Sequence, residues 1–582
     1  DGAYDLVLMP GLEEYYIGNL RIQRKIRCWI TGGRYAVTPV GSFEECRGAA
    51  LVDAARRSGN VFSEIAKMAL GAWDQVDLKV VHDTIARINR RGDCSDFYLV
   101  GLLGMIYRFS QDPDFPQELH QPLADCVLGF KYWHDEPGSD AMCYTTENHS
   151  ILFHACEALA GQLYPDRIFT NTGETGAQRR AKGERRALAW LRERGANGFK
   201  EWDSNCYFEE DTLALTHLAS LAQDEDVAAL ATVLLDKMFF TMAVNSFQGV
   251  FGSTHGRTYT QFIKSGYTEA TAGMSRLLFG MGVFNSHVLG TVGLACSDYE
   301  LPLLIAQIAT DRPADGLWSR ERHAGELAEW RNSGSHGVEV NKVTYKTPDF
   351  MLCSAQDWHP GEKGYQQHIW QATFGPEALV FVTHPVCASE DGSHRPNFWH
   401  GNDTLPRVAQ WQDLLVAIHN LPDDDWMGFT HAFFPAFAFD EYDLAGGWAF
   451  ARKGDGYIAL TASGDLTWMT SGDSAYRELR SYGTRNIWLC QMGRHALDGD
   501  FAAFKRKMLD LPVEFDELAV RIRSLRGDEV AFGWQGPLLL NGREQPITDF
   551  KHYDSPYCVA DLPAAHMDLE FGENVLRLEF SA

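Results

Sequence analysis

The sequence predicts a multidomain protein in which helices come first and strands follow: an (α/α) toroid and then a large antiparallel β-sandwich domain. Apolar residues recur at helical spacing in the first half, over 49–57, 61–73, 94–109, 150–163, 179–194, 211–222 and 224–244. Later segments alternate apolar and polar residues or are β-branched, as in 338–345, 378–383, 457–461 and 575–580. A chain of 582 residues is too long for one hydrophobic core, so several domains are expected.

The order of these segments sets the expected domain bounds. Helical segments without intervening strands favour a toroid or solenoid, here placed at 1–316. The segment 317–337 is rich in charge and glycine and is predicted to be a linker. We expect the β-sandwich at 338–512 and a small C-terminal β layer at 513–582.

Composition excludes some classes of function. A net charge of −26 argues against a general nucleic-acid binder, which needs a broad basic face. No run of eighteen or more apolar residues is present, so no membrane span is expected. The twelve cysteines are scattered without a CxxC pair, which disfavours a zinc finger.

A first polar cluster, Glu147-Asn148-His149, stands at the start of an apolar helical pattern. Buried Glu, Asn and His each need a hydrogen-bond partner, so a plain core does not explain them. One interpretation is that they satisfy the helix N-terminus. The other is that they line the mouth of the helical domain, where Asn148 or His149 bonds a substrate carboxylate.

A second cluster runs from Glu201 to Tyr207 and mixes Trp202, Asn205 and Tyr207 with acidic residues. Such a mixture suits a cleft that grips a sugar, although loop and capping chemistry or a core tyrosine would also explain it. For Tyr207 to act as a base, neighbouring cations must lower its pKa from an ordinary value of about 10.

Two further segments carry polar and aromatic side chains. His255, Arg257 and Tyr259 alternate in a glycine-rich stretch, so they share one face if that stretch is extended. Arg257 offers a forked grip for a carboxylate or sulfate, while a simple glycine-rich turn is the alternative. In the β region, alternation places His368 and Trp370 on one face, and a polar-aromatic loop ends at Arg407.

The order and spacing of these motifs resemble the heparinase II/III-like polysaccharide lyases, which include heparinases and some alginate and oligoalginate lyases. Those enzymes carry an Asn or His on a helix of the first half, then a catalytic Tyr, then a His from an early strand of the β domain. Here Asn148-His149 matches the first, Tyr207 follows Asn148 by 59 residues, and His368 matches the third.

The resemblance implies cleavage of a uronate-containing polysaccharide or oligosaccharide by β-elimination, outside the cell or in the periplasm. Asn148, with His149, would neutralise the carboxylate, Tyr207 would be the acid and also a candidate base, and His368 would be a second base or would lower the Tyr207 pKa. The expected substrate-binding residues are Glu147, Trp202, Asn205, His255, Arg257, Tyr259, Trp370 and Arg407. The strand reads His368-Ile-Trp370 and lacks the His-x-His pattern seen in that family. No cofactor is therefore required, and a structural divalent metal, although possible, is not supported by the spacing.

Two other functions fit the same residues. A glycoside hydrolase needs two carboxyl groups across the scissile bond, and five candidates are available: Glu147, Glu201, Asp203, Glu209 and Glu210. A non-enzymatic carbohydrate-binding scaffold would leave the polar cluster at 147–149 unexplained. Elimination and hydrolysis are distinguished by whether the product contains a new double bond.

Overall fold

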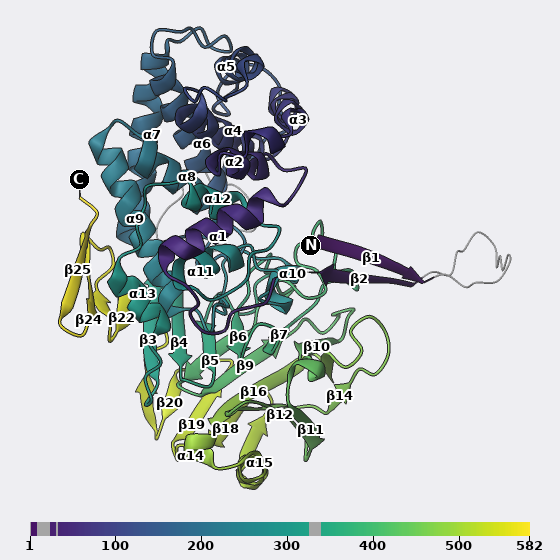
Figure 1. The fold of residues 1–582 in the computed structure, drawn as a ribbon. Helices are drawn as coiled ribbons and strands as arrows, with labels where there is room; N and C mark the ends of the chain where they lie inside the picture. The colour runs from purple at the N-terminus through teal and green to yellow at the C-terminus, as the bar shows by residue number, and fades with distance from the viewer. Residues whose placement is uncertain (1, 9–23, 31–32, 325–338, 582) are drawn as a thin grey trace, which may run out of the picture.

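The computed structural model describes residues 2–8, 24–30, 33–324 and 339–581 (Figure 1). The chain opens with an antiparallel hairpin of strands β1 (Gly2–Leu8) and β2 (Arg24–Ile30), within the region expected to be helical. Helices then follow in succession as far as Thr310. Strands are the main secondary structure after that point, so the predicted order of a helical part and then antiparallel sheets is confirmed.

The helical domain contains every helix predicted from apolar periodicity, together with several shorter helices. Its bounds are α1 (Phe43–Ala55), α2 (Val61–Ala69), α3 (Leu78–Asn89), α4 (Ser95–Phe109), α5 (His120–Gly129), α6 (Glu147–Leu163), α7 (Gly176–Asn197), α8 (Phe208–Leu221), α9 (Glu225–Val244), α10 (Thr260–Lys264), α11 (Ala272–Phe279), α12 (Leu289–Ala295) and α13 (Leu303–Thr310). The helices missed by periodicity include the four short ones from α10 to α13, which offer too few turns for a period to show.

The helices pack around one continuous apolar core. Helix α1 contacts α11 and α12, so the end of the helical series packs against its beginning (Figure 1). Helices α4, α6 and α8 contact one another. Helix α9 is long and apolar enough to cross a membrane, but 78% of its apolar window is buried inside the protein, as in an ordinary core helix.

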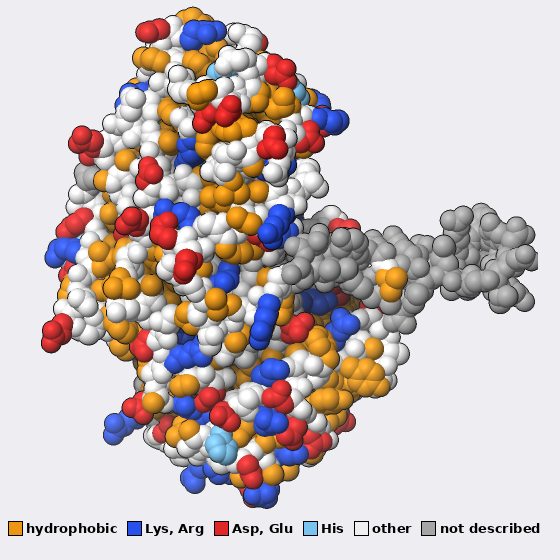
Figure 2. All heavy atoms as spheres, viewed as in Figure 1, with side chains coloured by type: hydrophobic (Ala, Val, Ile, Leu, Met, Phe, Trp, Pro, Cys, Tyr) orange, Lys and Arg blue, Asp and Glu red, His pale blue; other side chains and the backbone are white. Residues whose placement is uncertain are grey.

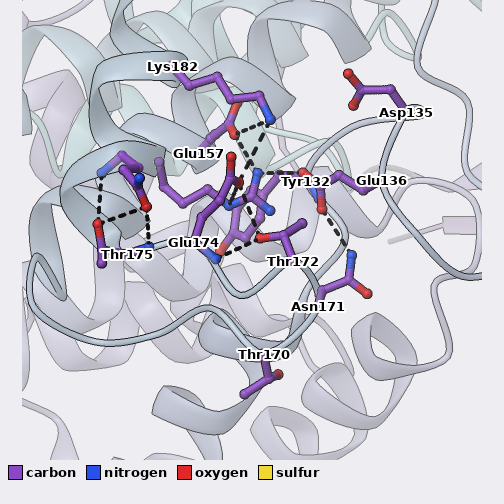
Figure 3. A network of polar contacts seen from close by, with 12 residues as sticks. Tyr132, Asp135, Glu136, Glu157, Thr170, Asn171, Thr172, Glu174, Thr175 and Lys182 are labelled. Carbon is purple, nitrogen blue, oxygen red and sulfur yellow. Dashed lines mark hydrogen bonds and ion pairs between the residues drawn. The ribbon is translucent and has the colours of Figure 1, made fainter.

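A buried ion network fixes α7 against α6 and the loop before α6 (Figure 3). The fully buried Arg179 contacts Glu136 at 2.5 Å, Glu157 at 2.7 Å and Glu174 at 3.2 Å. Lys182 lies 3.9 Å from both Glu157 and Glu174. The carboxylates balance the charge of the buried Arg179 guanidinium in place of water. The network therefore holds α6 and α7 together, and α7 leads into the 198–207 loop.

Two antiparallel sheets form the β-sandwich. The larger has the strand order β14-β15-β10-β7-β6-β5-β4-β3-β22-β23, and the smaller β11-β12-β13-β16-β9-β8. The larger sheet comprises β3 (Leu317–His323), β4 (Val340–Lys346), β5 (Met351–Gln356), β6 (Trp370–Thr373), β7 (Leu379–Thr383), β10 (Phe429–Phe433), β14 (Leu466–Trp468), β15 (Glu478–Tyr482), β22 (Tyr553–Ser555) and β23 (Cys558–Ala560). The smaller comprises β8 (Arg407–Trp411), β9 (Leu414–Asn420), β11 (Glu441–Ala445), β12 (Trp448–Lys453), β13 (Gly456–Ala462) and β16 (Arg485–Arg494).

The predicted linker and C-terminal layer differ from what is observed. The segment 317–337 begins with strand β3, which pairs with β4, and residues 325–337 lie outside the described residues. After helices α14 (His495–Asp498) and α15 (Phe501–Asp510), a five-stranded sheet packs on the smaller sheet of the sandwich. It comprises β17 (Val513–Asp516), β18 (Ala519–Arg523), β19 (Glu529–Gly533), β20 (Leu538–Leu540) and β21 (Arg543–Gln545).

The end of the chain returns to the helical domain. Strands β22 and β23 extend the larger sheet, and the hairpin of β24 (His566–Phe571) and β25 (Asn574–Glu579) packs on α9 and α13 (Figure 1). The C-terminal 70 residues therefore do not form one separate layer, because their apolar side chains complete cores of both domains.

Candidate active site

A cavity of about 890 Å³ lies between the helical domain and the β domain. One wall comes from the N-terminal ends of α4, α6 and α8 and from the loop before α10, and the other from β-domain loops at 358–367 and 390–395. Helix N-termini carry partial positive charge, which favours an anionic ligand. The lining residues include Thr146, His149, Lys200, Glu201, Trp202, Tyr207, Glu210, Arg257, Tyr259, Trp358, Tyr365, Gln367 and Arg395.

Tyr207 stands at the junction between the 198–207 loop and α8 and lines this cavity. Its hydroxyl is hydrogen-bonded to the hydroxyl of Tyr259 at 2.9 Å. The guanidinium of Arg257 lies 4.1 Å from the centre of the Tyr207 ring. Burial raises the pKa of Tyr207 well above 10, with Arg257 opposing that rise, so the resting form is the neutral phenol.

Arg257 is held from both domains. Its Nη1 donates to Glu201 at 3.0 Å, and its Nε donates to Gln366 of the β domain at 3.3 Å. The flanking backbone is paired as well, because His255 and His368 exchange two backbone hydrogen bonds of 3.0 and 2.8 Å. Burial raises the pKa of Glu201, and the charge of Arg257 opposes this rise.

His149 and Asn148 are neighbours in α6 but have different surroundings. His149 lines the cavity, stacks on Phe97 and donates from Nδ1 to Asp96 at 2.8 Å. Asn148 is completely buried, its Oδ1 accepts from Thr146 at 2.8 Å, and it is not among the residues that line the cavity. Successive residues of a helix point about 100° apart, so only one of the two faces the ligand.

His368, predicted as a second base, lies in the interior. It is hydrogen-bonded to Gln371 at 2.9 Å and stacks on His255 with ring centres 5.6 Å apart. Burial lowers the pKa of His368 to about 4. His255 is also fully buried, with Nδ1 bonded to the carbonyl of Asp203, and Trp370 belongs to the sandwich core.

The remaining predicted binding residues divide between the cavity and structural positions. Trp202 and Tyr259 line the cavity, and Trp202 donates to Thr254 at 2.8 Å. Glu147 instead accepts the backbone N–H groups of residues 200 and 201 and pairs with Arg194. Asn205 joins the carbonyl of residue 262 to the Thr258 hydroxyl, and Arg407 binds Asp357 and two carbonyls of the C-terminal sheet. These three side chains organise the walls instead of facing the cavity.

Of the five carboxylates considered for hydrolysis, only Glu201 and Glu210 line the cavity. Burial, together with the charge of Glu209, raises the pKa of Glu210 well above its ordinary value. Glu209 accepts from the backbone of residue 290, and Asp203 accepts from Ser253 and pairs with Lys342.

Arg395 was missed by the sequence patterns. It reaches the cavity from a β-domain loop, where it lies 5.4 Å from the ring centre of Tyr259 and donates to the Tyr365 hydroxyl at 3.3 Å. The segment Ser393-His-Arg395-Pro396 offered only a short polar stretch before a proline as a signal. Arg395 is the second guanidinium in the cavity, after that of Arg257. On the outer face shown in Figure 2, by contrast, acidic and basic side chains are interspersed.

Two groups of side chains within the described residues have the composition of a metal site. In the first, Asp203, Glu321 and His323 are all buried, but the ammonium of Lys342 pairs with Asp203 and lies 3.0 Å from Glu321. That lysine already supplies the positive charge a cation would bring. The second group, Asp93, Cys94 and His149, opens onto the cavity.

No protein-family model matches this sequence, and no curated protein is similar to it. Among solved structures, heparinase III is similar over 77% of this chain and 74% of its own, with 9% identity and a TM-score of 0.36. A chondroitin AC lyase of Streptomyces coelicolor A3 in complex with chondroitin sulphate is similar over 92% and 84%, with 12% identity and a TM-score of 0.38. The heparan sulfate lyase HepC of Pedobacter heparinus is similar over 77% of this chain and 73% of its own, with 10% identity and a TM-score of 0.31.

Proposed function

We propose that this protein is a polysaccharide lyase that cleaves a uronate-containing polysaccharide or oligosaccharide by β-elimination. The observation that carries the proposal is the Tyr207 hydroxyl, which lies in a cavity with the guanidinium of Arg257 over its ring and a second tyrosine hydroxyl at 2.9 Å. Because such polymers occur outside cells, we also propose an extracellular or periplasmic location.

Elimination begins with loss of the proton at C5, beside the uronate carboxylate. That proton is weakly acidic, so the carboxylate charge must be neutralised as the carbanion forms. We assign this role to His149 and Arg395, which reach the cavity from opposite domains. Asn148, predicted for the role from the sequence, has its side-chain oxygen bonded to Thr146 and is not among the residues that line the cavity.

Tyr207 is proposed to carry out both proton transfers of the elimination. As a phenolate it takes the C5 proton, and as the phenol it then gives a proton to the departing C4 oxygen. Arg257 favours the phenolate electrostatically, and the Tyr259 hydroxyl can donate a hydrogen bond to it. Both proton transfers use one hydroxyl, so the base and acid need not lie on opposite faces of the sugar.

Aromatic side chains on both walls are proposed to hold the flanking sugar rings. Trp202 and Trp358 meet edge to face with ring centres 5.2 Å apart, and both line the cavity. Tyr365 lines the same wall beside Arg395. Flat apolar faces combined with polar edges match the two-sided character of a sugar ring.

A glycoside hydrolase is the second candidate, because Glu201 and Glu210 both line the cavity. The raised pKa of Glu210 suits a general acid. Glu201 forms an ion pair with Arg257, which occupies one of its oxygens.

The experiment is digestion of a panel of uronate polysaccharides, with ultraviolet absorbance and product sizing measured together. A lyase creates a conjugated C4–C5 double bond and the absorbance rises with each cut. Shortened products without that absorbance would refute the lyase and favour the hydrolase. Glu210→Gln then separates the two, since a hydrolase loses its activity when a catalytic carboxyl becomes an amide, whereas Glu210 has no role in the proposed elimination.

A further inference from the structure

Three metal-binding side chains meet at the helical wall of the cavity. One ligand atom from each of Asp93, Cys94 and His149 lies within 4.8 Å of the other two, and all three residues line the cavity. Asp93 and Cys94 directly precede α4, while His149 comes from the first turn of α6. We call these three residues the Asp93–Cys94–His149 cluster.

The imidazole in this cluster is held in a fixed orientation. His149 is only 6% exposed, and its Nδ1 donates to the carboxylate of Asp96 at 2.8 Å. Asp96 is itself completely buried, and His149 stacks on Phe97 with ring centres 4.8 Å apart. Because Nδ1 is occupied, Nε2 is the ring nitrogen left for a ligand. A carboxylate behind the histidine recurs in metal sites, where it fixes the tautomer and makes the imidazole a better ligand.

The other two side chains are positioned by backbone contacts. The Oδ1 of Asp93 accepts the N–H groups of Cys94 at 3.1 Å and Cys143 at 3.3 Å, which leaves Oδ2 for another partner. Cys94 has a φ of 63°, in the left-handed region that residues other than glycine seldom adopt. Such backbone strain is retained where the surrounding structure requires a particular side-chain position.

The cluster can offer two anionic ligand atoms, from the carboxylate of Asp93 and the thiolate of Cys94. The buried Asp203–Glu321–His323 group differs, because Lys342 has its ammonium among the carboxylates.

We propose that the Asp93–Cys94–His149 cluster binds a divalent transition metal of the Zn²⁺ type, with a fourth coordination position open to the cavity. Thiolate, imidazole and carboxylate together are ligands that Zn²⁺ prefers. Tetrahedral bonds to such atoms place the ligands about 3.5 Å apart, so ligand atoms that lie within 4.8 Å of one another need to approach by no more than about 1.3 Å. The Cys94 thiol releases its proton to solvent as the metal–sulfur bond forms.

The open position gives the metal a role in the reaction, and this part of the inference rests on the proposed lyase function. A cation bound to Nε2 of His149 would lie where His149 was proposed above to neutralise the uronate carboxylate. A uronate oxygen that takes the fourth position is neutralised more completely than by an imidazole paired with Asp96. The metal site itself is independent of which reaction the cavity catalyses.

The test is titration of the intact chain with Co²⁺ alone, without any polysaccharide. One equivalent is expected to give visible bands of a four-coordinate ion and a near-ultraviolet thiolate-to-cobalt band, both displaced by Zn²⁺. Cys94→Ala should abolish the thiolate band. Cys387→Ala, which removes a half-exposed thiol from a β-domain loop outside the cavity lining, should retain it. Asp96→Asn should weaken Co²⁺ binding about 10- to 100-fold.

Absence of the thiolate band in the unaltered chain, or its persistence in Cys94→Ala, would overturn the proposal. If Cys94→Ala does not fold, Asp93→Asn replaces it, because Asp93 is exposed. Unchanged Co²⁺ affinity in Asp93→Asn would also count against the site. Since no substrate is present, failure of the metal site and failure of the lyase proposal are separate results.

Discussion

Replacing Tyr207 by phenylalanine removes one hydroxyl from the cavity and leaves the ring in place. The ring keeps its contact with Arg257, whose guanidinium lies 4.1 Å from the ring centre. A positioned acid–base group contributes about 10²- to 10⁴-fold to rate, which is roughly 3–5 kcal/mol of the barrier. The lost hydrogen bond to Tyr259 should lower the free energy of unfolding by only about 1 kcal/mol.

Tyr259→Phe is the matched control, because it breaks the same 2.9 Å hydrogen bond from the other side and leaves the Tyr207 hydroxyl intact. Both variants should lose the same small amount of stability in urea denaturation. Initial rates from ultraviolet absorbance, on the substrate found in the panel, should fall at least tenfold further for Tyr207→Phe than for Tyr259→Phe. Equal losses in the two variants, or a Tyr207→Phe rate within threefold of the unaltered enzyme, would refute the proton-transfer role.

Three further outcomes are expected. Burial raises the Tyr207 pKa above 10, so kcat/KM for elimination should still be rising at pH 9 because the phenolate fraction grows with pH; a plateau near pH 7 would contradict Tyr207 as the base. Arg395→Ala should raise KM about tenfold or more for a uronate oligosaccharide, since a charged hydrogen bond is lost. The inhibition constant of the carboxyl-reduced analogue, which binds but cannot undergo elimination, should not change. Lys342→Met should lower the free energy of unfolding, measured in urea, by about 3–5 kcal/mol, because Asp203 and Glu321 are then buried without a counter-charge. The control is Lys505→Met, which breaks a half-exposed ion pair with Asp443 and should lower that free energy by under about 1 kcal/mol.

The sequence predicted the succession of domains because long helices and strands leave different periods. The helical segments 94–109 and 224–244 match α4 and α9 to within one residue at each end. Strand β3 was missed because several of its residues, including Arg320 and Glu321, are charged. A charged segment is typical of a solvent-exposed linker, so the alternating burial of its side chains did not show in the sequence. In the fold Glu321 is buried against Lys342, so tertiary pairing overrides composition.

The candidate site was predictable only where one segment carries its own signal. Polar residues inside apolar helical patterns located His149 and Tyr207, and both line the cavity. A short motif does not say which of two adjacent residues faces a ligand, so Asn148 was assigned the place that His149 holds. Alternation put His368 on a common face with Trp370, but both residues are buried, so that face does not open to the cavity.

The side chains that meet only in the folded chain had no signal in the sequence. Cys94 and His149 are more than fifty residues apart, and metal-site spacing rules concern neighbours on one turn or loop. Arg395 joins Tyr259 from another domain.

The backbone pairing of His255 with His368 links the two domains at the point where Arg257 projects into the cavity. A hinge between the domains would have to break those two hydrogen bonds and also the contact of Thr258 with Gln366. Domain opening would therefore remove the contact from Gln366 and leave Glu201 as the hydrogen-bond partner that positions the Arg257 guanidinium. The orientation of the Arg257 side chain therefore depends on both domains and not on the helical domain alone.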